Sequence, residues 1–245
     1  MDVIFIVGTA GSGKSMMTSA ISKSLSDDGW SSATLNLDPF SDNLTYEPTV
    51  DVRNYIDYND LSRKYGLGAN GAMVFSMDML ATIIDGVLSE VEDADYLIVD
   101  TAGQLELFMF RQSGQYLFQR IGGENKALMF VSDIFLLSEI SNFLMMQILF
   151  SAMSSKYNSP ALQVINKIDL DEATAKRVKE WFLKPELPTD DLGKNAQALS
   201  KVYRVARSSG LLSPAFFTSA ATGSGMLELK AEISRIFKGG EDKKE

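Results

Sequence analysis

The sequence predicts an α/β fold in which a mostly parallel sheet carries helices on both faces. Apolar runs rich in β-branched residues alternate with helical patterns, and strands separated by helices form crossover connections to parallel neighbours. The expected strands are residues 2–7, 32–37, 95–100, 126–131, 161–166 and 214–219. With 245 residues, 45% of them hydrophobic, the chain is long enough to form one large domain over residues 1–245. Ligands of such sheets bind at the carboxyl ends of the strands.

A glycine-rich loop separates the first expected strand from the first expected helix. The loop consists of Gly8, Thr9, Ala10, Gly11, Ser12, Gly13, Lys14 and Ser15, and the helical pattern begins at Met16. This is the phosphate-binding P-loop pattern in its required setting of strand, loop and helix. Backbone N–H groups and the helix N-terminus surround the phosphates, Lys14 reaches the β- and γ-phosphates, and the Ser15 hydroxyl binds Mg²⁺. We therefore predict that residues 8–16 bind a nucleoside triphosphate.

The third expected strand ends in an acidic motif. Three apolar residues precede Asp100, Thr101, Ala102, Gly103 and Gln104. A buried strand that ends in Asp is typical of the metal-side carboxylate of P-loop nucleotidases, so we expect Asp100 to support Mg²⁺ directly or through water. Gly103 has no Cβ, which lets its backbone N–H approach a γ-phosphate. The alternative is that Asp100 is only a turn residue at the strand end.

The fifth expected strand is followed by Asn166, Lys167, Ile168 and Asp169. Guanine presents two parallel donors that the Asp169 carboxylate can accept together, whereas adenine would leave that carboxylate unpaired. We expect Asn166 at the opposite edge of the base and the Lys167 stem over its ring. Ser219 and Ala220 follow the last expected strand, and the Ala220 N–H is expected to donate to the guanine oxygen. These motifs predict GTP and GDP as ligands.

Two insertions interrupt the alternation of strands and helices. The first spans about residues 39–94 and includes a short helix near residues 59–64, a glycine-rich stretch at 66–71 and a long helix at about 72–92. The second spans residues 171–210 and is expected to be helical. We also expect single helices over residues 107–120 and 134–153. The charged tail, residues 238–245, is expected to fray.

Composition excludes several classes of function. A net charge of −9 argues against a surface that binds nucleic acid, which needs a basic stripe. The chain contains no cysteine and no histidine, so thiolate and imidazole metal sites are absent. The missing cysteines and a start, Met1-Asp2-Val3, without the basic segment of a secretory leader lead us to expect a cytoplasmic protein. Residues 134–153 are apolar but carry too many polar groups for a lone membrane span, so no membrane association is expected.

These motifs, with Asp38-Pro39 after the second strand and the long first insertion, make the chain resemble the GPN-loop GTPases. The resemblance covers essentially the full chain and is carried by residues 8–15, 37–39, 51–53, 100–104, 166–169 and 219–220. It implies a constitutive homodimer in which each subunit inserts its Gly-Pro-Asn loop into the neighbouring nucleotide site. Here that loop reads Gly68-Ala69-Asn70, so the proline is missing while the asparagine, which faces the phosphates in the family, is retained.

The resemblance also implies catalytic roles. It assigns Mg²⁺ to Ser15, Asp38 and Asp100, and the attacking water to Gln104 or Glu106. The residues alone leave this open, because without histidine the water can be oriented by Gln104, Glu106 or Asp38. Glu106 can instead be a charge that complements a helix N-terminus. The catalytic candidates are therefore Asp38, Asn70, Asp100, Gln104 and Glu106.

Some questions stay open at this stage. Arg53 is either an arginine finger or a partner of Asp51 or Asp57 in an ion pair. The leading hypothesis is a Mg²⁺-dependent GTPase switch that handles an unknown protein client. The alternatives are a P-loop kinase of a small molecule or polynucleotide end, and a nucleotide-binding scaffold without turnover. Methionines at 73, 77, 79, 145, 146 and 153 either form an apolar client groove or pack in the core, and core packing is the simpler interpretation.

Overall fold

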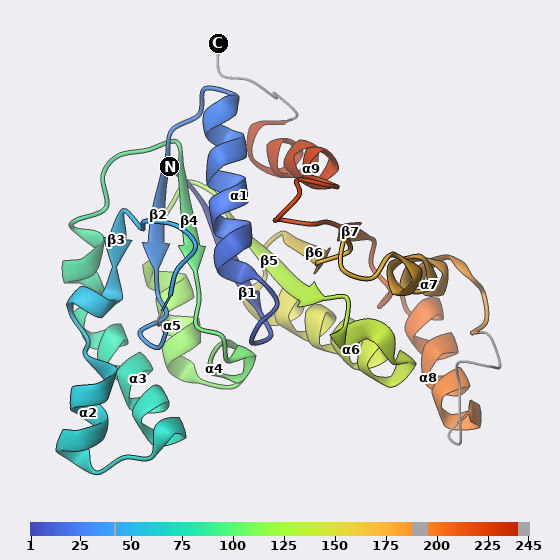
Figure 1. Ribbon diagram of the computed structural model, residues 1–245, viewed down its shortest axis with the longest axis horizontal. Helices are drawn as coiled ribbons and strands as arrows, with labels where there is room; N and C mark the ends of the chain where they lie inside the picture. The colour runs from blue at the N-terminus through green and yellow to red at the C-terminus, as the bar shows by residue number, and fades with distance from the viewer. Residues whose placement is uncertain (42, 188–195, 240–245) are drawn as a thin grey trace.

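The computed structural model describes residues 1–41, 43–187 and 196–239. Its seven strands form one sheet in the order β3-β2-β4-β1-β5-β6-β7, and all neighbouring strands pair in parallel (Figure 1). The strands are β1 (Asp2–Gly8), β2 (Ser32–Asn36), β3 (Val50–Asp51), β4 (Tyr96–Asp100), β5 (Lys126–Asp133), β6 (Ala161–Asn166) and β7 (Ala215–Phe217). The expected α/β class is confirmed.

Helices cover both faces of this sheet. The α-helices are α1 (Lys14–Asp27), α2 (Tyr58–Tyr65), α3 (Ala69–Leu88), α4 (Leu105–Met109), α5 (Gln112–Arg120), α6 (Ile140–Tyr157), α7 (Glu172–Leu183), α8 (Ala196–Ser208) and α9 (Met226–Lys238). Two 3₁₀ turns, η1 (Val52–Asn54) and η2 (Leu136–Ser138), lie between them. Helices α1 and α9 pack on one face, while α3, α5 and α6 pack on the other.

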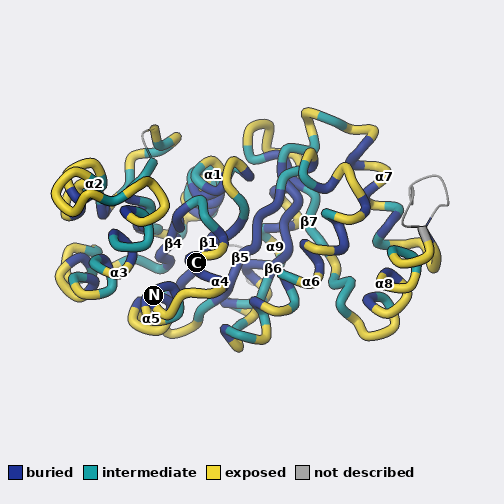
Figure 2. The backbone as a smooth tube through the Cα atoms, turned by 90° about the horizontal axis from the view of Figure 1, so that it is seen from below, coloured by how far each residue is buried: buried dark blue, intermediate teal, exposed yellow. Residues whose placement is uncertain are grey.

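Strand β1 shows why the central strands read as continuous apolar runs. Val3 and Phe5 point into the cluster beneath α3, α5 and α6, whereas Ile4 and Ile6 point into the cluster beneath α1 and α9. All four side chains are fully buried, because successive residues of a strand face opposite sides and both sides are covered. Figure 2 shows the same arrangement as a buried central sheet with exposed residues on the surrounding helices. The sheet thus forms a rigid base for the loops at its carboxyl edge.

The first insertion differs from the prediction in two places. It contains the edge strand β3, which at two residues is too short to leave a periodic signal. Its long helix begins at Ala69 rather than at residue 72, with Gly68 as the N-cap residue, and it ends at Leu88 rather than at residue 92. Ala69 therefore occupies the first helical position, where proline is readily accommodated and alanine has high helix propensity. Asn70 lies in the first turn of α3 and not in a loop.

The helix expected over residues 134–153 begins later. The Asp133 carboxylate accepts a hydrogen bond from the backbone N–H of Leu136 at 2.9 Å, which favours the short turn η2. Helix α6 starts only at Ile140 and continues to Tyr157. A local side-chain bond to the backbone has therefore displaced the helix start.

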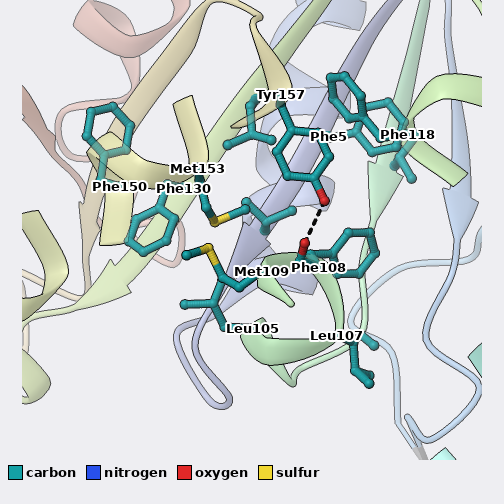
Figure 3. Packing of buried hydrophobic residues seen from close by; sticks show 14 of the residues in the cluster. Phe5, Leu105, Leu107, Phe108, Met109, Phe118, Phe130, Phe150, Met153 and Tyr157 are labelled. Atoms are coloured by element: carbon teal, nitrogen blue, oxygen red, sulfur yellow. Dashed lines mark hydrogen bonds between the residues drawn. The ribbon is translucent and has the colours of Figure 1, made fainter. Parts of the chain in front are cut away.

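The helix expected over residues 107–120 is divided into α4 and α5. The hydroxyl of Tyr157 donates to the carbonyl oxygen of Phe108 at 2.7 Å (Figure 3). The Lys156 ammonium donates to the carbonyl oxygen of Met109 at 2.7 Å. In a continuous helix these two carbonyls would accept from backbone N–H groups four residues later. Because α6 supplies donors instead, the helix ends at Met109 and restarts at Gln112.

The second insertion folds as α7 and α8, as expected for its described residues, while residues 188–195 lie outside the described part of the chain. The tail was expected to fray from residue 238, but Lys238 is the last residue of α9. Its ammonium lies 2.7 Å from the Asp2 carboxylate and over the rings of Trp30 and Tyr96. Burial of Asp2 makes this pair an anchor for α9. Residues 240–245 are outside the described part.

Several methionines of the apolar helices belong to the core. Met77, Met146 and Met153 are buried in the core, which accounts for these methionines without a groove, whereas Met145 is half-exposed.

By length and composition alone, α3 is the one helix among the described residues that is apolar enough to cross a membrane, and a third of its most apolar window is buried in the fold. Core helices of soluble proteins pass the same test, so this is weak evidence for a span.

We expect Tyr157→Phe to lower the free energy of unfolding by about 1 kcal/mol, because the Phe108 carbonyl loses its shortest hydrogen bond. Urea denaturation followed by circular dichroism measures the change. The control is Tyr116→Phe, which removes a hydroxyl from an exposed position on α5. Equal stabilities of the two variants would contradict this role of Tyr157.

Candidate nucleotide-binding site

A cleft of about 470 Å³ opens at the carboxyl ends of the strands. Loops after β1, β2, β4, β6 and β7 contribute to its wall, so segments far apart in the sequence meet there. The lining residues are Gly11, Gly13, Lys14, Ser15, Met16, Asp38, Asn43, Thr45, Thr101, Gly103, Asn166, Lys167, Asp169, Leu170, Ser219 and Ala221. This volume suits one nucleotide-sized ligand. The three motifs that the sequence identified separately therefore face one cavity.

Close backbone approach explains two glycines of the P-loop. A Cβ atom at Gly8 would lie 2.0 Å from the carbonyl oxygen of Val131 on the neighbouring strand. Gly13 has a left-handed φ of 90°, and a Cβ there would lie 2.5 Å from the side-chain amide nitrogen of Asn166. Only glycine fits both constraints at position 13. The loop after β1 can therefore curl tightly before α1 starts at Lys14.

Lys14 is held inside the P-loop. Its ammonium donates to the carbonyl oxygens of Gly8 at 3.3 Å and Thr9 at 3.0 Å, and its side chain is buried. Burial lowers the pKa of Lys14, although the nearby carboxylates of Asp100 and Asp38 act in the opposite direction. The cleft thus contains a positive group partly removed from water, where it interacts strongly with an anion.

Asp38 connects the segment after β2 to the acidic motif after β4. Its carboxylate accepts from the backbone N–H of Phe40 at 2.9 Å and from that of Gly103 at 3.3 Å. Burial raises the pKa of Asp38, while these two hydrogen bonds and the charge of Lys14 oppose the shift. The Gly103 N–H that was expected to meet a γ-phosphate is therefore bonded to Asp38 in this structure.

Asp100 is almost completely buried at the end of β4. Burial raises its pKa to about 6, against the opposing effects of the Ser15 hydroxyl, the Lys14 ammonium and the Tyr46 hydroxyl. One carboxylate oxygen, Oδ2, accepts from the Tyr46 hydroxyl at 3.2 Å. Burial is the main cause that raises the pKa of Tyr46, so this hydroxyl keeps its proton and is the donor.

The oxygen groups here fit a Mg²⁺ ion. The second oxygen of Asp100, Oδ1, is buried and makes no hydrogen bond to any described residue. The described residues contain no group of three or more acidic, histidine or cysteine side chains that could cage a metal. Mg²⁺ does not need one, because it usually keeps several waters and binds through one or two protein ligands plus substrate phosphates. The Ser15 hydroxyl and the carboxylates of Asp38 and Asp100 would serve in this way.

Asn166 uses both ends of its side-chain amide to join loops. Its nitrogen donates to the carbonyl oxygen of Ser12 at 3.0 Å, and its oxygen accepts from the backbone N–H of Ala220 at 3.0 Å. The neighbouring Lys167 has a left-handed φ of 65°, and its ammonium donates to the carbonyl oxygen of Gly11 at 2.5 Å. Residues expected to touch the base therefore also tie its binding loop to the P-loop.

The base end of the cleft differs in detail from the prediction. Asp169 lines the cleft and is exposed, and exposed Leu170 beside it adds an apolar surface. Ser219 and Ala221 line the cleft, whereas the N–H of Ala220 is bonded to Asn166. The remaining P-loop candidates, Gly8, Thr9, Ala10 and Ser12, belong to the loop but do not line the cavity.

Sequence reasoning missed several residues of the site. Thr101 lies inside the acidic motif, where its hydroxyl donates to the carbonyl oxygen of Ile6 at 2.8 Å, and Leu170 directly follows the base motif. Because both residues belong to or adjoin a recognised motif, the sequence could have indicated them. Asn43, Thr45 and Tyr46 lie in the first insertion, and no pattern in the sequence marks them.

Four of the five catalytic candidates do not line the cleft, and one of them, Asp100, lies buried at the end of β4. Asn70 is exposed in the first turn of α3. Gln104 is the N-cap residue of α4, and Glu106 is exposed in its first turn, where a negative charge complements the helix N-terminus. Arg53 forms the ion pair considered for it, with 2.6 Å between its guanidinium and the Asp51 carboxylate.

The fold and this cleft define a P-loop nucleotidase with a guanine-type base motif. Residues 6–239 match the protein family described as "conserved hypothetical ATP binding protein". Among similar curated proteins, GPN-loop GTPase 1 of Schizosaccharomyces pombe is 28% identical over 91% of this chain, and GPN-loop GTPase PAB0955 of Pyrococcus abyssi is 29% identical over 74% of it. The chain belongs to this family, that of the GPN-loop GTPases.

A solved structure agrees with this assignment. The crystal structure of the Pyrococcus abyssi GTPase in its apo form superimposes with a TM-score of 0.82 at 26% identity, covering 96% of this chain and 97% of that one. The chain aligns to 65% of the length of the fission yeast protein and 73% of the archaeal protein. The similar proteins are GTPases, although the family description mentions ATP.

We expect Asn166→Ala to weaken GDP and GTP binding equally, by about 2 kcal/mol or roughly 30-fold, because two loops lose a buried hydrogen bond each. Isothermal titration calorimetry measures both affinities. Asn59→Ala, on the exposed surface of α2, is the control. If the variant lost affinity for only one of the two nucleotides, Asn166 would not act by joining the two loops.

Proposed function

We propose that this GTPase requires Mg²⁺, acts as a homodimer and uses its nucleotide cycle on a protein partner. The main support is that the P-loop, Asp38, residues of the acidic motif and the base motif all line one cleft. Membership of the GPN-loop GTPase family supplies GTP as substrate. A kinase or a scaffold without turnover would leave either the guanine motif or the metal-side carboxylates without a role.

Guanine selectivity rests on Asp169. Its carboxylate lines the cleft beside the Lys167 stem and Leu170, so a base can lie between these groups and direct its donor edge at the carboxylate. The hydrogen bonds of Asn166 hold the base motif at a fixed distance from the P-loop. Adenine would leave the Asp169 carboxylate without the two hydrogen-bond donors that guanine supplies. The free energy lost in this way favours GTP over ATP.

Hydrolysis in this cleft depends on positioning and charge neutralisation. Lys14 and the P-loop N–H groups bind the phosphates, and the Gly103 N–H passes from Asp38 to the γ-phosphate. Bound Mg²⁺ neutralises charge that develops on the phosphates. Gln104 or Glu106, at the start of α4, orients the attacking water once that segment closes over the nucleotide.

A second subunit would complete the site. Asn70 is exposed and lies outside the cleft of its own chain, and α3, which carries it, has a largely apolar surface that the fold only partly covers. Packing of two such helices across a two-fold axis would bury this surface, because two-fold interfaces bring the same patch of each subunit together. Each Asn70 would then face the neighbouring nucleotide and donate from its amide without adding charge.

The protein partner is the least specified part of the proposal. Met145 and Ile148 are half-exposed and lie three residues apart on α6. Phe135, which precedes that helix, is also half-exposed. Apolar side chains of this kind suit an adaptable contact with a client.

Asp169→Asn should shift the preference from GTP toward xanthosine triphosphate. The amide presents a donor to the 2-oxo group of xanthine, whereas it loses one acceptor for the guanine donors. Binding of GTP, ATP and xanthosine triphosphate is compared by calorimetry for the variant and the parent chain. Equal binding of ATP and GTP by the parent chain would contradict the guanine assignment.

The trans role of Asn70 predicts that Asn70→Ala slows hydrolysis while GDP affinity stays near its original value. An oriented donor of this kind contributes up to about 3 kcal/mol in a transition state, which is roughly 100-fold in rate. Single-turnover hydrolysis and GDP titration measure the two quantities.

A mixed dimer separates trans action from cis action. One subunit carries Asn70→Ala and the other carries Lys14→Ala, which removes tight triphosphate binding. Under trans action, the only competent site faces an intact Asn70 and keeps its rate. A slow mixed dimer would indicate cis action, and a chain that is monomeric at micromolar concentration with both GDP and a GTP analogue would refute the dimer.

A further inference from the structure

The Ser15 hydroxyl lowers the pKa of Asp100, and Tyr46 makes a second side-chain hydrogen bond to the same carboxylate. The Tyr46 hydroxyl lies 3.2 Å from Oδ2, while Oδ1 of the same carboxylate stays buried without a hydrogen-bond partner. The two oxygens are therefore not equivalent. A carboxylate held through one oxygen cannot rotate freely, and its other oxygen keeps a constant direction.

The segment that carries Tyr46 is fixed to the sheet just after it. The Thr49 N–H donates to the Thr34 hydroxyl oxygen at 3.0 Å, and the Thr34 N–H donates to the Thr49 hydroxyl oxygen at 3.0 Å. Thr34 lies on β2, the strand beside β4, which ends in Asp100. These two hydrogen bonds fix Thr49 to the sheet, and Tyr46 precedes Thr49 by three residues.

The same segment also reaches the nucleotide cleft. Asn43 and Thr45 line the cavity, so one short stretch of chain touches both the space for the nucleotide and the carboxylate beneath it. Neither the P-loop nor the acidic motif requires a tyrosine at this place. A purely apolar side chain would fill the space equally well but would leave Oδ2 without a donor.

We propose that Tyr46 is a positioning residue, which holds Oδ2 of Asp100 and leaves Oδ1 as the oxygen that would support Mg²⁺. This inference rests on the proposed Mg²⁺ dependence and adds a residue to it. Groups that orient a metal-side ligand are commonly worth 10- to 100-fold in metal affinity. Tyr46 acts through Asp100 and touches neither metal nor nucleotide.

The test compares Tyr46→Phe with the parent chain, since this change removes only the hydroxyl. MgCl₂ is titrated calorimetrically into the GDP complex, and GDP affinity is measured separately in excess chelator. We expect Mg²⁺ affinity to fall by about 10-fold, with GDP affinity in chelator unchanged. Tyr55→Phe, in the same insertion and partly exposed, is the matched control and should keep the Mg²⁺ affinity of the parent chain.

A double-mutant cycle with Asp100→Asn tests whether Tyr46 acts through Asp100. On that background, Tyr46→Phe should have no further effect on Mg²⁺ affinity. An unchanged Mg²⁺ affinity in the single variant, or a 10-fold loss that persists beside Asp100→Asn, would overturn the inference while leaving the proposed function intact. Failure of the parent GDP complex to bind Mg²⁺ at all would instead overturn the proposed Mg²⁺ dependence, and the inference with it.

Discussion

The nucleotide cleft depends on the side-chain amide of Asn166. Fully formed hydrogen bonds at both ends of this buried group join the P-loop after β1 to the loop after β7, with β6 between them. Gly13 makes this contact possible, because a Cβ atom there would collide with the amide nitrogen. One buried polar group thus sets the distance between the phosphate end and the base end of the site. Leaving either end unpaired would cost more than the net stabilisation by an ordinary hydrogen bond.

The charges of the cleft form a second constraint. Lys14 and Asp100 are buried, and the half-buried Asp38 carboxylate on the cleft wall interacts with both of them. Burial shifts all three pKa values toward the neutral form of each group, and the attraction between Lys14 and the two carboxylates opposes these shifts. A nucleotide with its metal ion brings charges of both signs, which offset the charges of Lys14, Asp38 and Asp100. The site is therefore electrostatically prepared for its ligand before the ligand arrives.

Contacts between helices decided details that local patterns could not. The ends of α4 and α5 follow from donors on α6, since Tyr157 and Lys156 bind carbonyls that a continuous helix would have used. The late start of α6 has a local cause instead, the bond between Asp133 and the backbone of Leu136. The periodicity of apolar residues in these regions is helical throughout, so it contains no sign of the interruptions. Helix boundaries depend on hydrogen bonds whose donors lie far along the chain.

The sequence by itself determined the fold class, the P-loop, the acidic motif and the base motif, because these depend on local backbone chemistry. Residues such as Gly13 and Lys14 have few other uses at that spacing between a strand and a helix. Only the tertiary structure decided that Asn166 joins loops, that Asp38 holds the Gly103 N–H, and that Tyr46 reaches Asp100. Each of these bonds joins residues 54 or more positions apart. Such contacts leave no periodic trace, since they form only after the sheet has brought its strand ends together.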